Sequence, residues 1–356
     1  MTQKTKHKRL TAVVLSIATY LLAGCGGSQA ATTAPVTTKS EYQNPLKSSG
    51  PDPWVYQQDG VYYYMNTTGV DIQLWKTTDL GKLATAEHKV VWTPETGKAW
   101  SHEVWAPEIT RWNGKWYIYF CADAGTNETH RVYVLENPSA DPMQGTWSLK
   151  GKVADASDKW AIDPDVFEAN GQHYIVWSGW EGDTDGEQRI YIAHMKDPWT
   201  VDTPRVELSR PEYAWEKHDD RKQDFQLKVN EGPEGMVHGN KLFVAYTGSA
   251  CWSDEYAVGM LEAPLTADPL VKANWSKSPE PLLKKSPDHH AYATGHNGFF
   301  TAPNGQSWII YHANLEANQG CGDKRNPRLQ PVTWDGNGMP VFGEAADVYK
   351  IMDGPK

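Results

Sequence analysis

Three acidic residues of this chain lie in similar sequence surroundings, each followed by a proline within two residues. Asp52 stands in Gly-Pro-Asp-Pro-Trp, Asp163 in Ala-Ile-Asp-Pro and Glu231 in Asn-Glu-Gly-Pro. An Asp-Pro pair is a common turn signal, so one such acid alone would indicate little. Each of the three, however, comes just before an expected strand, at the same position of a repeated segment. We therefore expect the carboxylates to converge on one site, an arrangement typical of acid–base chemistry.

Converging carboxylates suit the cleavage of a glycosidic bond. One carboxyl group protonates the departing oxygen, and another acts across the sugar ring as a base or nucleophile. A third carboxylate raises the pKa of the acid by like-charge repulsion and can orient it. Some of the 17 Trp and 17 Tyr residues must fill the core, and a surplus suits stacking on sugar rings.

The three acids belong to a repeat that occurs five times along the chain. Each copy has a polar cluster with Pro or Gly, a strand, a turn containing Gly and an aromatic-rich strand; the copies start near residues 52, 106, 163, 231 and 295. Hairpins repeated at a period of roughly 50 residues are typical of β-propeller blades. The sequence thus predicts an all-β fold, a five-bladed β-propeller, with the three acids at one mouth of its axis.

The first residues have the composition of a targeting segment. Basic residues precede the apolar run Leu10–Leu22, which is too short for a stable membrane span and ends in Leu-Ala-Gly-Cys25. This pattern resembles a bacterial lipoprotein signal; an ordinary cleaved signal with an incidental Cys is the alternative. We expect a signal peptide over residues 1–24, a lipidated Cys25 with a flexible tether over residues 25–40, and a catalytic propeller over residues 41–356.

Lipid on Cys25 would hold the protein at a bacterial cell envelope, on the outer membrane or in the periplasm if the host is Gram-negative. The formal net charge of −10 disfavours nucleic acid and anionic lipid surfaces as partners, so membrane contact is expected through the lipid alone. A neutral polysaccharide is compatible with this charge.

The other cysteines indicate an oxidised protein. Cys251 and Cys321 lie at matching places in the fourth and fifth repeats. Outside the cytoplasm a disulfide between them is expected, with two free thiols as the alternative. Cys121 lies in an aromatic strand and is expected to be a buried small apolar residue.

Together these segments resemble family-43 glycoside hydrolases over nearly everything from Asn44 to Gly343. The segments that carry the resemblance are Gly50-Pro-Asp-Pro, Val104-Trp-Ala-Pro-Glu, Ala161-Ile-Asp-Pro, Asn230-Glu-Gly-Pro, Gly295-His-Asn-Gly and Tyr311-His-Ala. The resemblance implies a five-bladed propeller that inverts the anomeric centre and requires no cofactor. It assigns Asp52 as the general base, Glu231 as the general acid and Asp163 as the residue that tunes Glu231.

The resemblance also bears on the substrate. Four segments are most similar to members that release L-arabinose from the non-reducing ends of α-1,5-linked arabinan: Trp160-Ala-Ile-Asp, His130-Arg-Val-Tyr-Val-Leu-Glu, Trp177-Ser-Gly-Trp and Arg325-Asn-Pro-Arg-Leu-Gln. Those members more often follow Ile-Asp with Gly, whereas this chain has Pro164, as other branches do. A β-xylosidase or an arabinoxylan-debranching α-L-arabinofuranosidase is therefore the alternative.

Further residues are candidates for binding the substrate. Trp105, Trp54 and Trp252 could stack on a pentose, with packing between blades as the alternative for each. By resemblance His296 lies on the axis, where some family members hold a structural calcium or other ion, and Arg325 reaches the catalytic centre. An arginine there would keep Asp52 ionised. Glu108 and Glu234, slightly further along their repeats, are expected to be structural acids.

Two other functions were weighed against this one. A retaining fructan hydrolase is also a five-bladed propeller, but it would need Asn-Asp-Pro-Asn-Gly at the first acid and Glu-Cys at the third. A surface-anchored sugar-binding propeller without catalysis would have no need for three acids in matching positions. The long segment Ser209–Asn230, Asn314–Asn326 and a Cys251–Cys321 bridge would wall the site and favour attack at a chain end.

Overall fold

The computed structural model describes residues 40–221 and 226–356. The expected signal peptide, Cys25 and all but the last residue of the expected tether lie outside the described residues. Within the described ranges no helix is long and apolar enough to cross a membrane. The secondary structure is β-strands and short 3-10 helices, so the prediction of an all-β fold is confirmed.

The first two sheets are regular antiparallel sheets of four strands each. The first contains β2 (Trp54–Gln58), β3 (Val61–Met65), β4 (Ile72–Thr77) and β5 (Glu87–Trp92). The second contains β6 (His102–Trp112), β7 (Lys115–Asp123), β8 (Arg131–Asn137) and β9 (Ser148–Val153).

The next strands form two antiparallel groups that share one hydrogen-bonded path. One group is β10 (Ala161–Ala169), β11 (Gln172–Gly179) and β12 (Glu187–Asp197), with β13 (Thr200–Val201) and β14 (Val206–Ser209) paired to β12. The other is β15 (Lys228–His238), β16 (Lys241–Gly248), β17 (Ala257–Pro264) and β18 (Ser276–Lys277). A short parallel pairing of β12 with β15 joins the groups.

The remaining strands make smaller sheets. A three-stranded sheet holds β19 (Tyr292–Thr301), β20 (Ser307–Asn314) and β21 (Asn326–Pro331), and β22 (Thr333–Trp334) pairs with β23 (Pro340–Val341). The first and last strands, β1 (Glu41–Gln43) and β24 (Ile351–Asp353), pair with each other. The 3-10 helices are η1 (Leu80–Thr85), η2 (Asn127–Thr129), η3 (Ala214–Glu216), η4 (Lys272–Asn274) and η5 (Pro287–His289).

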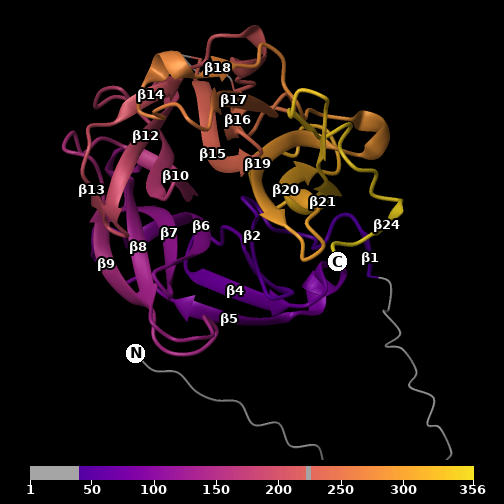
Figure 1. Ribbon diagram of the computed structural model, residues 1–356, viewed down its shortest axis with the longest axis horizontal. Coiled ribbons are helices and arrows are strands. Elements are labelled where there is room, and N and C mark those ends of the chain that lie inside the picture. Colours follow the sequence, from indigo (N-terminus) through magenta and orange to yellow (C-terminus); the bar gives the residue numbers. More distant parts are fainter. Residues whose placement is uncertain (1–39, 222–225) are drawn as a thin grey trace, which may run out of the picture. The chain divides into compact units, whose positions relative to one another are not determined.

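The strand that begins each repeat lies innermost (Figure 1). β2 contacts β6, β6 contacts β10, β10 contacts β15, β15 contacts β19, and β19 contacts β2 again. The strands that follow in each repeat, such as β5, β9 and β18, are drawn further out (Figure 1). This arrangement brings the starts of all the repeats together although they are far apart in sequence.

Apolar clusters fill the interfaces between successive sheets. Tyr63 and Met65 of the first sheet pack with Ile118 and Phe120 of the second, and corresponding clusters join the later sheets in turn. One cluster joins the last large sheet to the first, where Tyr62 meets Phe300 edge-on with ring centroids 5.6 Å apart. Much of the aromatic surplus therefore packs between sheets.

Candidate active site

A left-handed backbone residue marks the start of each innermost strand. These residues are Asp52 (53°), Ala106 (43°), Asp163 (54°), Gly232 (53°) and His296 (46°); β6 and β19 each have a second one nearer their first residue, Glu103 (48°) and Ala293 (49°). In β6, β10, β15 and β19 the strand register shifts at this residue, as it does at a β-bulge. A left-handed conformation costs about 1–2 kcal/mol for a residue other than Gly, and such strain is concentrated at functional sites.

Side chains from neighbouring repeats hold these strained residues in place. The backbone N–H of Asp52 donates to Nδ1 of His312 (3.1 Å), and that of Gly232 donates to Oδ2 of Asp163 (3.0 Å). The N–H groups of Ala106 and His296 donate to threonine hydroxyls in the same way. The strain is thus offset by contacts between repeats.

The three acids do not all occupy the same position of the repeat, although the sequence pattern predicted that they would. Asp52, Asp163 and His296 occupy the left-handed position, but Glu231 precedes it, because Gly232 is the left-handed residue of β15. In β6 and β10 the residues equivalent to Glu231 are Trp105 and Ile162. A bulge places two residues opposite one partner residue, so both can face the same side. The carboxylates therefore converge from two different backbone positions.

One cavity of about 490 Å³ is lined by all three acids. Of the other predicted site residues, it is also lined by Trp105, Trp252, His296 and Arg325. Each of the three carboxylates is buried, with at most 9% of the residue exposed. The structure thus brings together most of the residues that the sequence singled out.

Asp52 is surrounded by nitrogen atoms. Nη1 of Arg325 donates to Oδ1 of Asp52 at 2.7 Å, and Nδ1 of His296 lies 3.2 Å from the same oxygen. Burial alone would raise the pKa of Asp52, but Arg325, followed by His296, holds it well below its usual range. Asp52 is therefore a carboxylate near neutral pH.

His312 is a neutral residue that contacts the backbone of Asp52. Burial and the nearby Arg325 hold the pKa of His312 well below its usual range. Because Nδ1 accepts the N–H of Asp52, we assign the ring proton to Nε2. His312 thus acts on Asp52 chiefly through its backbone, and Arg325 supplies the permanent charge.

Glu231 and Asp163 behave in the opposite way. Burial raises the pKa of Glu231 to about 7, and the charge of Asp52 adds to this. Burial also raises the pKa of Asp163 to about 7, with further contributions from Glu231 and Asp52 against the opposing effect of His296. The hydroxyl of Tyr256 donates to Oε1 of Glu231 at 2.9 Å and fixes its orientation. The cavity thus holds an ionised carboxylate and carboxyl groups that keep a proton near neutral pH.

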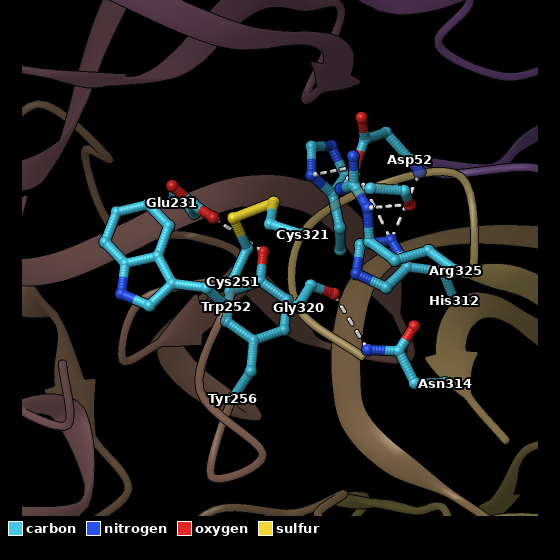
Figure 2. Close-up of a disulfide and its surroundings, with 12 residues drawn as sticks. Asp52, Glu231, Cys251, Trp252, Tyr256, His312, Asn314, Gly320, Cys321 and Arg325 are labelled. Carbon is cyan, nitrogen blue, oxygen red and sulfur yellow. Dashed lines mark hydrogen bonds and ion pairs between the residues drawn. A yellow bond between two sulfur atoms is a disulfide. The ribbon is translucent and has the colours of Figure 1, made fainter. Parts of the chain in front are cut away.

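Cys251 and Cys321 form a disulfide on the wall of this cavity (Figure 2). Cys251 follows β16 in the loop that leads to Tyr256, and Cys321 precedes Arg325 in the loop before β21. The bond therefore ties the segment that contacts Glu231 to the segment that contacts Asp52. Cys121 is the free cysteine of the described chain, and it is buried.

Trp54 does not belong to this cavity, contrary to the sequence prediction. It is 8% exposed, its indole N–H donates to the carbonyl of Ile109 at 2.8 Å, and it packs in the core between the first two sheets. Trp54 is two residues past the left-handed Asp52, so its side chain is directed into the interior instead of the mouth. It lines a different cavity, together with Asp165 and Glu234.

Trp105 and Trp252 are better placed to meet a sugar. Trp105 stacks on the ring of His130 at 4.3 Å, and Trp252 donates to Asp219 while Arg221 lies 3.5 Å above its ring. Trp160, which stacks on Trp180, adds a further aromatic wall that the sequence analysis did not assign to binding. Aromatic faces of this kind bind the apolar faces of sugars.

The sequence analysis missed two residues that contact the catalytic acids, and a third, Asp165, that lies further along β10. Tyr256 carries no motif that marks it, whereas His312 lies in the Tyr-His-Ala segment already noted. Asp165 is two residues after Asp163, just as Glu108 is two residues after Ala106. That spacing was the available signal for Asp165.

The residues that could hold a metal ion lie away from His296. Ligand oxygens of Glu108, Asp165 and Glu234 all lie within 4.8 Å of one another, and all three residues are buried. His296 belongs to no such group within the described ranges. The ion beside His296 that the family resemblance implies stays a prediction.

Comparisons with known proteins agree with this geometry. The model of glycosyl hydrolases family 43 matches residues 42–340. An extracellular exo-alpha-(1->5)-L-arabinofuranosidase of Streptomyces avermitilis is 34% identical over 342 residues, covering 94% of this chain and 69% of the relative. A protein of the same name from Streptomyces chartreusis is 34% identical over 304 residues, 82% of this chain and 90% of the relative.

A solved structure gives the same answer. The crystal structure of an alpha-L-arabinofuranosidase from Lactobacillus brevis has a TM-score of 0.78 and 32% identity to this chain, covering 86% of this chain and 98% of its own. The family model spans all the repeats and all three acids of the cavity. This chain is therefore a member of glycosyl hydrolase family 43.

Proposed function

We propose that this protein is an inverting glycoside hydrolase that releases L-arabinose from the non-reducing ends of α-1,5-linked arabinan or arabino-oligosaccharides. The observation that carries the proposal is that two buried carboxyls of one cavity have opposite surroundings, since Arg325 contacts Asp52 and not Glu231. Asp52 is held ionised by Arg325, while burial raises the pKa of Glu231 to about 7. Groups whose environments drive their pKa values apart are the usual acid and base of an enzyme.

In this mechanism Asp52 is the general base and Glu231 the general acid. Asp52 takes a proton from a water molecule, whose oxygen bonds to the anomeric carbon as the bond to the departing oxygen breaks. Glu231 gives its proton to that oxygen, so one water is consumed for each bond cleaved. Inversion follows because water enters on the face opposite the departing group. Proton exchange with solvent then restores both carboxyls.

Asp163 is the residue that keeps the acid protonated. The ionised forms of Glu231 and Asp163 repel each other, so the two carboxyls do not readily lose both protons, and Oδ2 of Asp163 accepts the N–H of Gly232, the next residue along β15. Asp163 therefore acts on Glu231 through both charge and backbone position. Arg325 and His296 contact Oδ1 of Asp52 and favour its ionised form.

Two observations support arabinose and attack at a chain end. The relatives from Streptomyces and Lactobacillus brevis are named arabinofuranosidases, and two of them are named as exo-acting on α-1,5 linkages. In this chain the Cys251–Cys321 disulfide and the loop residues Arg221 and Trp252 line one side of the cavity. A walled cavity admits a chain end and excludes a chain middle.

The decisive experiment is time-resolved chromatography on linear arabinan, arabinoxylan and xylo-oligosaccharides. We expect arabinose as the first and only early product from linear arabinan, and NMR should show inversion at the anomeric carbon. Early di- and trisaccharides would indicate endo action, and xylose without arabinose would favour the β-xylosidase alternative. Release from arabinoxylan alone would favour a debranching enzyme. No release of sugar by wild-type protein would reject the glycosidase assignment.

We propose a five-bladed propeller as the architecture that positions this site. Its support is the cycle of contacts among β2, β6, β10, β15 and β19, together with the apolar cluster between the last large sheet and the first. Each blade would contribute one left-handed residue to the mouth. A crystal structure of the protein would test the number of blades directly.

We also propose secretion by a lipoprotein signal, with lipid on Cys25 and residues 26–40 as a tether at the cell envelope. The names of the Streptomyces relatives as extracellular proteins support secretion. Mass spectrometry of the mature protein should find the lipid on Cys25. Cys25→Ala should leave soluble or unprocessed protein, and unchanged membrane fractionation would contradict the anchor.

A further inference from the structure

A second set of carboxylates lies further along the innermost strands. Glu108, Asp165 and Glu234 each come two residues after a left-handed residue, namely Ala106, Asp163 and Gly232. The other two innermost strands have Trp54 and Gly298 at this position. A Cβ atom on Gly298 would lie 2.8 Å from the Trp54 ring, so Trp54 occupies the space that Gly298 leaves free. The three acids therefore occupy the other three of these five equivalent positions.

These three carboxylates are buried and close together. Glu108, Asp165 and Glu234 are 8%, 2% and 2% exposed, and one oxygen of each lies within 4.8 Å of the others. Oδ2 of Asp165 accepts the N–H of Gly235 at 2.8 Å. By contrast, Oε2 of Glu108 and Oε2 of Glu234 are buried without any hydrogen-bond partner. Buried acceptors without donors, next to other carboxylates, indicate a missing positive group.

The described part of the chain supplies no cation here. No Lys, Arg or His side chain of the described residues acts on the pKa of any of the three, whereas Arg325 and His296 act on the pKa of Asp52. Burial raises the pKa of Glu108 and Glu234 well above its usual range, and repulsion from neighbouring carboxylates adds to this. Such a cluster must either keep protons or bind a cation.

Glu234 is the carboxyl that a shared proton does not satisfy. The carboxyls of Glu108 and Asp165 hydrogen-bond to each other, which needs one proton, whereas Oε2 of Glu234 has no hydrogen-bond partner among the described residues. Calcium binds oxygen at about 2.3–2.6 Å, so two oxygens bound to one ion are at most about 5 Å apart. One oxygen from each of the three residues lies within 4.8 Å of the others, which is close enough to share an ion.

Water can reach this position. Asp165 and Glu234 line a cavity of about 690 Å³ that is lined by none of the three acids of the candidate active site. An ion held by three carboxylates needs further oxygen ligands, which water from this cavity would provide.

We propose that Glu108, Asp165 and Glu234 form a binding site for one hard divalent cation of the calcium or magnesium class. The site is separate from His296 and from the catalytic carboxyls, and it ties three innermost strands, β6, β10 and β15, to one another. Its function is to stabilise the fold beneath the active site. The proposal stands whether or not the protein hydrolyses arabinan, because its test measures metal and stability.

The test uses the purified full-length protein after treatment with a chelator and dialysis into metal-free buffer. CaCl₂ and MgCl₂ are then titrated by calorimetry, and bound metal is counted by plasma mass spectrometry. We expect one ion per chain and a rise in melting temperature of about 5 °C when the ion is at 100 times its dissociation constant. Glu234→Gln and Glu108→Gln should each abolish both effects.

Two control variants make the result specific. Glu168→Gln lies on the same strand as Asp165 but is exposed, and it should bind one ion like wild type. His296→Ala should also keep the ion. The proposal is overturned if the wild-type protein binds no ion, or if the ion survives Glu234→Gln and Glu108→Gln. Loss of the ion in His296→Ala alone would assign it to His296 instead. Should Glu234→Gln not fold, Glu108→Gln decides.

Discussion

Two levels of carboxylates on the same innermost strands have opposite surroundings. At the mouth, Asp52 contacts Arg325 and Glu231 contacts Tyr256. Two residues further along the strands, Glu108 and Glu234 have oxygens without partners. All are buried, so burial alone does not decide the protonation of a carboxyl. The groups that later loops bring to each level decide it, and only the mouth receives an arginine.

The largest difference between the levels should appear in catalysis. Glu231→Gln and Glu234→Gln make the same change on one strand, β15. Because Glu231 delivers the proton in the proposed mechanism, its loss should lower kcat on arabino-oligosaccharides by about 10²–10⁴-fold. Glu234→Gln should cost less than about tenfold well below its melting temperature, since it does not touch the reacting atoms. Equal losses in both variants would remove the distinction between the levels.

Arg325 is the residue that separates the mouth from the deeper level. Its charge lowers the pKa of Asp52, so Asp52 stays ionised in acid. In Arg325→Ala this pKa should rise by about 1–3 units, and activity should be lost at a higher pH as the pH falls. The acid limb of the profile of kcat/KM against pH measures this shift.

A matched control is Arg221→Ala, because Arg221 lines the same cavity and pairs with Asp219 instead of Asp52. It should change KM without moving the acid limb. An acid limb that stays in place in Arg325→Ala would show that another group keeps Asp52 ionised.

The disulfide borders the mouth alone. Its two cysteines are 70 residues apart in sequence, and replacing both by Ser should lower the free energy of unfolding by about 2–4 kcal/mol. Urea denaturation measures this loss. The rise in melting temperature caused by the divalent cation should be unchanged in the double variant, because the proposed ion lies at the other level. A cation effect that disappears with the disulfide would mean that the two levels are coupled.

The smallest expected effect concerns Tyr256. The acid must be protonated to act, so activity should fall as the pH rises through about 7, where the coupled pair Glu231 and Asp163 titrates. The Tyr256 hydroxyl favours the ionised form of Glu231, and Asp52 and Arg325 act on it in opposite directions. In Tyr256→Phe the basic limb should therefore move up by about 0.5–1 pH unit, the equivalent of one hydrogen bond. A shift to lower pH would contradict this role.

Much of the architecture could be predicted because its signals are local. Asp59-Gly60, Asn113-Gly114 and Asn170-Gly171 turn between strands with positive φ at both residues, as two-residue hairpin turns require. The aromatic strand after each turn packs between sheets as its composition indicates. The three acids were found in the same way, from short motifs next to expected strands.

What the sequence could not determine depends on a bulge or on distant packing. Glu231 is one residue away from the position of Asp52 and Asp163, because the left-handed residue of its strand is a glycine. Trp54 has the sequence surroundings of a site residue, yet it lies in the core. There its ring fills the space beside Gly298, and its indole N–H donates to the carbonyl of Ile109.

The charge on Asp52 and the grouping of the deeper carboxylates depend on tertiary structure. The partner of Asp52 is Arg325, 273 residues away in sequence; the family resemblance pointed to this arginine, but no local pattern links the two residues. Asp165 was not marked as a candidate by its sequence surroundings. Its importance appears only in the fold, where strands β6, β10 and β15 place it close to Glu108 and Glu234. Residue types and turns are determined locally, so the sequence shows which groups are available for chemistry. Their protonation depends on desolvation and on charges within a few ångströms, which exist only after the strands have packed.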